Sequence, residues 1–117
     1  MSVLDMVLTK ELVESPITVN TDYESQIVDI TNREDEFSMQ MIYNNGSSVD
    51  MTFSLELSSD GINFSEVTDS SQLISDASGS HVFDVYGTGT NYARVKITVA
   101  AGSIDLQRVI YSAKRRH

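Results

Sequence analysis

The sequence contains no cysteine, which excludes both a disulfide framework and a zinc site built on thiolates. No apolar run approaches the ~20 residues that a membrane-spanning helix needs. The first six residues lack the basic-then-apolar pattern of a signal peptide. Together these absences predict a protein that folds in a cytoplasm and has no membrane partner.

Histidine is almost as scarce, because His81 and His117 are the only two. A lone histidine at the start of an expected strand, such as His81, is more often a satisfied structural residue than a general base. The sequence also lacks a Gly-rich phosphate loop, a Gly-x-Ser-x-Gly elbow and a His-rich metal cluster. We therefore predict no catalytic residue, no metal and no cofactor, which leaves a small hydrolase as the weakest alternative.

Basic residues are rare over most of the chain. Residues 1–90 contain only two of them against sixteen acids, a net charge of −14, whereas residues 91–117 carry a net charge of +5. The acidic majority argues against nucleic acid as a partner, since phosphate binding needs a basic face. The basic end is either a solvated tail or a segment that pairs with an acidic surface, such as that of a neighbouring copy.

What the sequence does contain is a two-residue alternation of apolar and polar side chains, at 37–43, 51–58 and 93–99. This period is typical of antiparallel strands with one apolar and one wet face. Other strands are expected at 17–20, 26–31, 72–74, 81–86 and 104–111, with turns at 44–46, 60–61 and 101–103. The pattern predicts an all-β fold: an antiparallel β-sandwich of about eight strands, jelly-roll or Greek-key in type.

A chain of 117 residues is long enough for one domain, which we place at 16–112. Residues 1–15 form an N-terminal arm or a short helix, and 113–117 form a basic C-terminal tail. The arm has apolar residues that would share a helical face but also suit an extended strand: Leu4, Val7, Leu8 and Leu12. They either cover the chain's own core or dock on a neighbouring subunit.

The segment 54–67 contains two alternating runs that flank Ser-Ser-Asp-Gly, a candidate ligand loop. A calcium loop needs several oxygen ligands, yet this stretch offers Asp60 as its one acid between the runs. A sugar site needs an exposed aromatic ring, and Phe64 falls on the apolar register. The segment is better explained as a β-hairpin that turns at Asp60-Gly61.

Two motifs in this chain resemble those of discoidin-like and phage-virion β-sandwiches. The first is the hairpin with Ser-x-Asp-Gly-x-x-aromatic at 58–64, and the second is Tyr-x-Arg-Val at 92–95, followed by a Gly-Ser turn and a last strand. The resemblance covers about residues 37–111, and Phe64 stands where such families usually carry tryptophan. The missing cysteines and signal peptide favour the phage side over secreted discoidin domains.

The resemblance implies a non-enzymatic virion structural protein, most simply a capsid decoration or cement subunit that coats the phage head. Its partners would be the major capsid protein or a tail protein, and it would form a homo-oligomer such as a trimer. The contact residues would lie at the two ends of the chain: Leu4, Val7, Leu8, Leu12, Lys114, Arg115 and Arg116.

The alternative is a carbohydrate- or receptor-binding module of a tail or fibre. Its ligand loop would use Asp60, Asn63 and Asn91, since loops of sandwiches commonly carry binding sites. Arg94 could contact a partner in either case. On an alternating strand, however, it is better explained as the partner of a carboxylate across the sheet.

Overall fold

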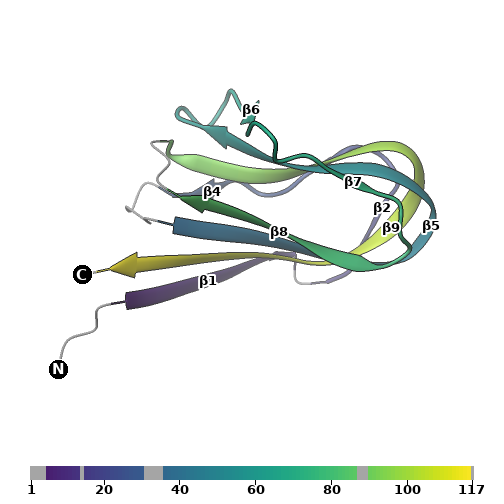
Figure 1. Cartoon of the computed structure of the whole chain (residues 1–117), viewed down its shortest axis with the longest axis horizontal. Coiled ribbons are helices and arrows are strands. Elements are labelled where there is room, and N and C mark those ends of the chain that lie inside the picture. The colour runs from purple at the N-terminus through teal and green to yellow at the C-terminus, as the bar shows by residue number, and fades with distance from the viewer. Residues whose placement is uncertain (1–4, 14, 31–35, 87–89, 117) are drawn as a thin grey trace.

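The computed structural model describes residues 5–13, 15–30, 36–86 and 90–116, with side chains from Thr9 to Ala113 inside these ranges. All the described strands belong to one antiparallel sheet, and no described residue is helical (Figure 1). The strands are β1 Asp5–Val13, β2 Ile17–Val19, β3 Tyr23–Glu24, β4 Val28–Asp29, β5 Glu36–Ser58, β6 Ser65–Glu66, β7 Gln72–Ile74, β8 Gly79–Tyr86 and β9 Tyr92–Arg116. The predicted all-β antiparallel class is confirmed.

Two long strands, β5 and β9, organise the fold. They pair with each other from Glu36 opposite Lys114 to Ser58 opposite Tyr92, through a series of register shifts near the middle. At these shifts both ribbons curve around one end of the molecule, so their two halves lie in separate layers (Figure 1). Bulges of this kind bend strands and increase their twist.

The bend depends on residues that accept unusual backbone angles. Asn45 and Ser48 have φ values of 54° and 50°, and Gly102 on the partner strand has 84°. A Cβ atom on Gly102 would lie 2.3 Å from the carbonyl oxygen of Ser48, so only glycine fits there. The turn residues at 44–46 and 101–103 therefore do not close hairpins as predicted. They lie inside continuous strands, where they form the corner of the sheet.

The rest of the chain follows these two strands. From β1 to β4 the N-terminal segment pairs antiparallel with β9, first near Arg116 and finally at Tyr92. From β6 to β8 the chain pairs antiparallel with β5 in the same way. The first layer therefore has the order β1, β9, β5, β8, and the second contains β3 and β4, β9, β5, then β6 and β7.

The hydrophobic core lies between the layers and follows the predicted alternation. Met39, Met41 and Phe53 are fully buried, whereas the neighbouring Ser38 and Gln40, which point to the other face, are half-buried. Each such side chain contributes about 1.5–3 kcal/mol on burial. The predicted inward positions that are buried are Phe37, Met39, Met41, Tyr43, Met51, Phe53, Leu55, Ala93, Val95 and Ile97.

The wet face predicted for 51–58 is wrong at three positions. Ser54, Glu56 and Ser58 are buried even though they alternate with core residues. Arg94 binds the Glu56 carboxylate, and the loop after β5 closes over Ser58 with hydrogen bonds to its hydroxyl. From Phe53 to Ser58, side chains on both faces of β5 are therefore mostly removed from water.

The N-terminal segment is extended over its described part. Residues 5–13 form β1, which pairs with Val109–Arg116 of β9, and the helical alternative is not observed there. Leu12 and Val13 are buried in the chain's own core. Residues 1–4, including Leu4, lie outside the described residues.

Candidate interaction surfaces

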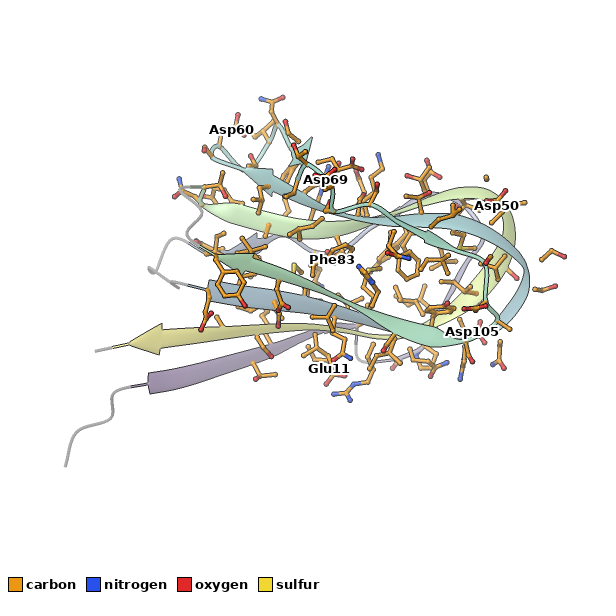
Figure 2. The ribbon with its side chains drawn as sticks, viewed as in Figure 1. Glu11, Asp50, Asp60, Asp69, Phe83 and Asp105 are labelled. Carbon is orange, nitrogen blue, oxygen red and sulfur yellow. The ribbon has the colours of Figure 1, made fainter. Side chains whose placement is uncertain are left out.

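The hairpin loop between β5 and β6 lies at the end of the molecule away from the bend (Figure 2). Its centre is the Asp60 carboxylate, whose Oδ1 accepts hydrogen bonds from the backbone N–H of Ile62 at 2.9 Å and of Asn63 at 2.8 Å. Oδ1 also accepts from Ser58 Oγ, and Oδ2 accepts from Asn63 Nδ2. These donors, led by the N–H of Asn63, hold the pKa of Asp60 well below its usual range.

The three residues of the proposed ligand loop are brought together, but they bind the protein itself. Asn91 donates from Nδ2 to the carbonyl of Ser59 at 3.1 Å, and its backbone N–H donates to the carbonyl of Ser58. Asp60 and Asn63 bind each other. The predicted hairpin is confirmed, and its polar groups are occupied in holding the turn.

A second cluster centres on Arg94, on the outer face of the second layer. Its Nε lies 2.7 Å from Glu56 Oε1, directly across the sheet, and its Nη2 lies 2.9 Å from Glu24 Oε2. The guanidinium stacks 4.0 Å from the centre of the Phe64 ring. Pairing of Arg94 with a carboxylate is thus confirmed. The apolar-register assignment of Phe64 is wrong, because the ring covers this ion pair outside the core.

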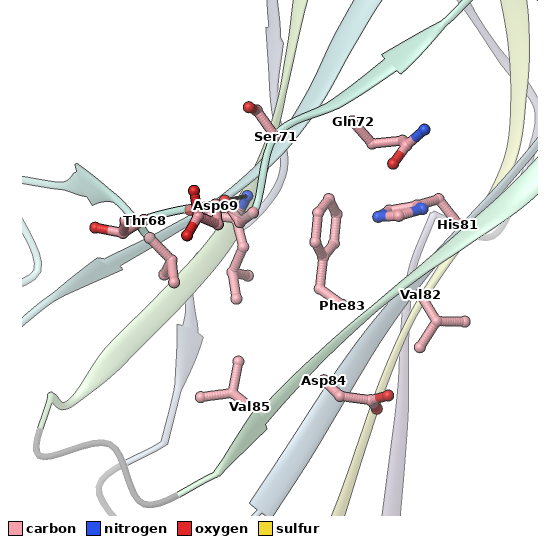
Figure 3. A pocket seen from close by; sticks show the side chains of 12 residues that line it. Thr68, Asp69, Ser71, Gln72, His81, Val82, Phe83, Asp84 and Val85 are labelled. Atoms are coloured by element: carbon pink, nitrogen blue, oxygen red, sulfur yellow. Dashed lines mark hydrogen bonds between the residues drawn. The ribbon is translucent and has the colours of Figure 1, made fainter.

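A pocket of about 310 Å³ opens between β8 and the segment that leads into β7. In Figure 3, Phe83 projects between Asp69 on one side and Gln72 and His81 on the other. Burial lowers the pKa of His81, whose ring meets Phe83 edge-on at 4.5 Å. The residues that line the pocket are Leu55, Val67, Thr68, Asp69, Ser70, Ser71, Gln72, His81, Val82, Phe83, Asp84 and Val85.

The polar side chains that line this pocket are hydrogen-bond donors and acceptors. The Ser70 hydroxyl is already engaged, since it accepts from the N–H of Leu55 at 3.2 Å and donates to the same residue's carbonyl at 3.4 Å. Asp69 adopts a φ of 63°, which a non-glycine residue rarely does, at the point where the chain turns over the pocket. Carboxylate, amide and imidazole groups above an apolar floor suit a polar or cationic group.

The two outermost strands of the first layer form the third surface. Among the described residues β1 pairs only with β9, and β8 pairs only with β5. On β8, Val82 is 44% exposed and Tyr86 is 72% exposed. The outer edges of the second layer are built instead from strands of two or three residues, namely β3, β4, β6 and β7.

The residues that the sequence singled out at the two chain ends meet in this layer. Val7 lies opposite Lys114, and the residues before it lie opposite Arg115 and Arg116. Leu8 lies opposite Ala113, whereas Leu12 is buried in the core. Sequence reasoning placed these ends as separate contacts and did not foresee that they form one strand pair.

Sequence reasoning also missed the pocket. The sequence predicted the strand at 72–74, but nothing in the surrounding small residues indicated that the segment before it would lie against β8. Within the described ranges, no group of three or more His, Cys, Asp or Glu side chains is placed to hold a metal ion. The same ranges contain no helix that could cross a membrane.

Neither a known family model nor a curated protein sequence matches the chain. Its fold does match solved structures. The SPBc2 prophage-derived protein YomS is 13% identical, with a TM-score of 0.62 over 98% of both chains. A chain from Bacillus endospore appendages, a family of disulfide-linked pili, is 12% identical with a TM-score of 0.55, over 96% of this chain and 89% of that one.

The enzymatically active domain of bacteriophage CBA120 tailspike protein 4 contains the fold as a part. It is 12% identical with a TM-score of 0.59, over 96% of this chain but only 18% of the tailspike chain. At these identities the likenesses establish the fold alone. The phage part of the resemblance is in keeping with two of these neighbours, and the discoidin part has no support among them.

Proposed function

We propose that this chain is a non-enzymatic structural subunit of a phage particle. The observation that carries the proposal is the end-to-end match with a prophage-derived protein, which covers 98% of both chains. A match of this extent means that the two chains share one fold over nearly the whole of the given sequence. A continuous sheet with a closed core suits a role in which rigidity matters more than chemistry.

Within that class, the role of a capsid decoration or cement subunit is our first choice, and a tail component is the second. The partner would be the major capsid protein or a tail protein, reached after folding in the host cytoplasm. The strand pair of β1 and the end of β9 is the contact surface we favour, because the acidic chain gathers Lys114, Arg115 and Arg116 there. A cationic strand end on an acidic protein steers it toward one orientation of docking.

The non-enzymatic part of the proposal is supported by three polar side chains described above, each of which is already engaged with other groups of the protein. Asp60 is held by four donors, Ser70 is engaged with Leu55, and the His81 ring packs on Phe83. No activated nucleophile follows from these arrangements, because activation needs a base within hydrogen-bond reach of the attacking atom.

The test is fractionation of particles from cells that produce the phage or prophage which encodes the chain. Heads and tails are separated on density gradients, and the chain is counted by quantitative mass spectrometry against the major capsid and tail-tube proteins. Enrichment in heads at a copy number comparable to the capsid protein supports the decoration role. Enrichment in tails supports the tail role, and absence from both fractions contradicts the proposal.

A carbohydrate-binding role is the second candidate, and the pocket beside β8 is the observation that favours it. Gln72, His81 and Asp84 supply amide, imidazole and carboxylate groups of the kind that sugar hydroxyls bind. Binding to a glycan array that is lost in Gln72→Ala and retained in Asp60→Ala would support this role. Equal binding by both variants, or none by the unaltered chain, would remove it.

A further inference from the structure

The Asn45-Gly46 step lies at the corner of the sheet, and it is the single Asn-Gly pair of the sequence. Asparagine followed by glycine is the sequence most prone to deamidation. The reason is that glycine has no side chain to hinder attack of its nitrogen on the asparagine amide carbon. Asn45 is exposed, so water reaches it. The step therefore combines a reactive sequence with access to solvent.

Deamidation at this step needs no reactant other than water. The Gly46 nitrogen loses its proton to hydroxide and attacks Cγ of Asn45. The Cγ–Nδ2 bond breaks, and Nδ2 takes up a proton from water and leaves as ammonia. Water then opens the resulting succinimide ring. Cleavage between the nitrogen and Cγ gives aspartate, whereas cleavage between the nitrogen and the backbone carbonyl carbon gives isoaspartate, in which the main chain runs through Cγ.

In the folded chain both reacting groups are engaged elsewhere. The N–H of Gly46 donates to the carbonyl of Ala77 at 2.8 Å, and Nδ2 of Asn45 donates to Oδ2 of Asp105 at 3.0 Å. A hydrogen bond to a carbonyl favours the protonated nitrogen, and a neighbouring carboxylate opposes the negative charge that attack requires. The two backbones also approach closely, since a Cβ on Gly46 would lie 2.8 Å from Cα of Ala77. The native corner thus keeps the step unreactive.

The two protecting partners come from distant parts of the chain. Ala77 lies between β7 and β8, and Asp105 lies on β9. Their contacts with Asn45-Gly46 exist only while these segments meet at the corner. We propose that Asn45 is a latent modification site, which the folded corner protects and which deamidates when the corner opens. The inference goes beyond the proposed function, because it concerns the chain in whatever particle contains it.

Either product would oppose closure of the corner. Aspartate at position 45 places a carboxylate beside Asp105 where a donor stood, and like charges in such close contact repel. Isoaspartate adds a carbon to the main chain of β5 between Asn44 and Ser47, where the register with β9 already shifts. Deamidation would therefore turn a reversible opening of the corner into a permanent one.

The chain supplies an internal reference in Asp60-Gly61, which can form the same ring with loss of water. The N–H of Gly61 donates to Ser58 Oγ at 2.9 Å, and the four donors to the Asp60 carboxylate lie within the same loop. This loop lies at the end of the molecule away from the bend (Figure 2). Modification at Asp60 therefore follows the opening of its own loop, and a change confined to the corner should not affect it.

The first test follows deamidation of the full chain by peptide mapping and mass spectrometry, in mildly alkaline buffer with and without guanidinium chloride. Deamidation at Asn45 is expected to be at least about tenfold slower in the folded chain than in the unfolded chain. In the unfolded chain Asn45 should react faster than every other asparagine. Equal rates in the two states, or no preference for Asn45 in the unfolded chain, overturn the inference.

The second test asks whether the contact with Asp105 protects Asn45. In the folded chain, Asp105→Ala should deamidate at Asn45 about threefold faster or more, because it loses the anchor of the reacting side chain. The matched control is Asp50→Ala, which removes the same charge from an exposed carboxylate at the same bend (Figure 2). No increase over the control, or an equal increase at Asp60-Gly61, overturns the inference.

The third test encodes the aspartate product directly. Asn45→Asp is expected to lower the melting temperature by about 4 °C or more at neutral pH. The further change Asp105→Asn should restore most of this loss, because an amide at position 105 can donate to the carboxylate at position 45. Unchanged stability of Asn45→Asp, or no rescue by the second change, contradicts the predicted effect on the corner. None of these results bears on the particle fractionation, so the two proposals can fail separately.

Discussion

Arg94 and Glu56 face each other across the central strands of the second layer, with 2.7 Å between Nε and Oε1 and with the Phe64 ring over the guanidinium. Glu56 is 8% exposed, so its charge depends on Arg94 for compensation. Breaking a buried pair by removing one partner leaves an uncompensated charge, which is costlier than replacing both partners.

We expect Arg94→Ala to lower the free energy of unfolding by about 2–4 kcal/mol. The double variant Arg94→Met with Glu56→Leu should lose less than Arg94→Ala alone, since it leaves no unpaired carboxylate. Urea unfolding monitored by circular dichroism measures both. A loss under about 0.5 kcal/mol for Arg94→Ala is typical of a surface ion pair, and it would show that solvent screens the charges of Arg94 and Glu56.

Two glycines with positive φ should tolerate alanine to different degrees: Gly102 lies at the corner of the sheet, and Gly61 lies in the loop between β5 and β6. Gly102→Ala would place a Cβ 2.3 Å from a backbone carbonyl oxygen, so we expect a loss of at least about 3 kcal/mol or failure to fold. Gly61→Ala meets only the Tyr92 ring at 3.3 Å and should cost about 1–2 kcal/mol. Thermal and urea unfolding of the two variants give the order, and a larger loss for Gly61→Ala would contradict this account of the bend.

The lowered pKa of Asp60 predicts that its carboxylate stabilises the folded protein less at acidic pH. The pKa of Asp60 is lower in the folded protein than in the unfolded chain. Its contribution to folding stability is therefore fully present above its ordinary pKa of 3.8, and it is lost as the pH falls through the lower pKa of the folded protein. The unaltered chain should therefore exceed Asp60→Ala in urea midpoint at pH 7 and pH 5, and the gap should narrow at pH 3. A gap that is the same at all three values would show that the carboxylate charge does not hold the loop.

His81 predicts a change of stability near neutrality. Burial lowers its pKa below the ordinary 6.5, so the unfolded chain binds the proton more readily than the folded one. Stability should decrease as the pH falls through about 6.5 and below, and His81→Phe should remove that part of the decrease. Melting temperatures between pH 8 and pH 5 test this. Identical slopes for the two proteins would mean that His81 titrates as if exposed.

The sequence predicted the alternating core well, because burial on one face of a strand leaves a local signal. Met39, Met41 and Phe53 are at the positions that a period of two assigns to the interior. The corner was missed because Asn45 and Gly102 carry the residue preferences of a hairpin turn. Positive φ is needed in both structures, and only the long-range pairing of β5 with β9 distinguishes them.

The candidate surfaces were less predictable, because each joins segments far apart in the chain. The alternation around Phe64 predicts a core residue, but its ring covers an ion pair whose two partners lie 38 residues apart in the sequence. The pocket arises where the segment before β7 lies against β8. The Asp60 loop was predictable as a turn, since its hydrogen bonds are local and its Asp-Gly sequence favours it.

The central claim, that the chain is a structural subunit of a phage particle, is tested most directly by a cryo-EM map of the particle that its genome encodes. We predict density for the bent sheet at a repeating position on the head or tail. A complete particle map with no density for this fold would contradict the claim.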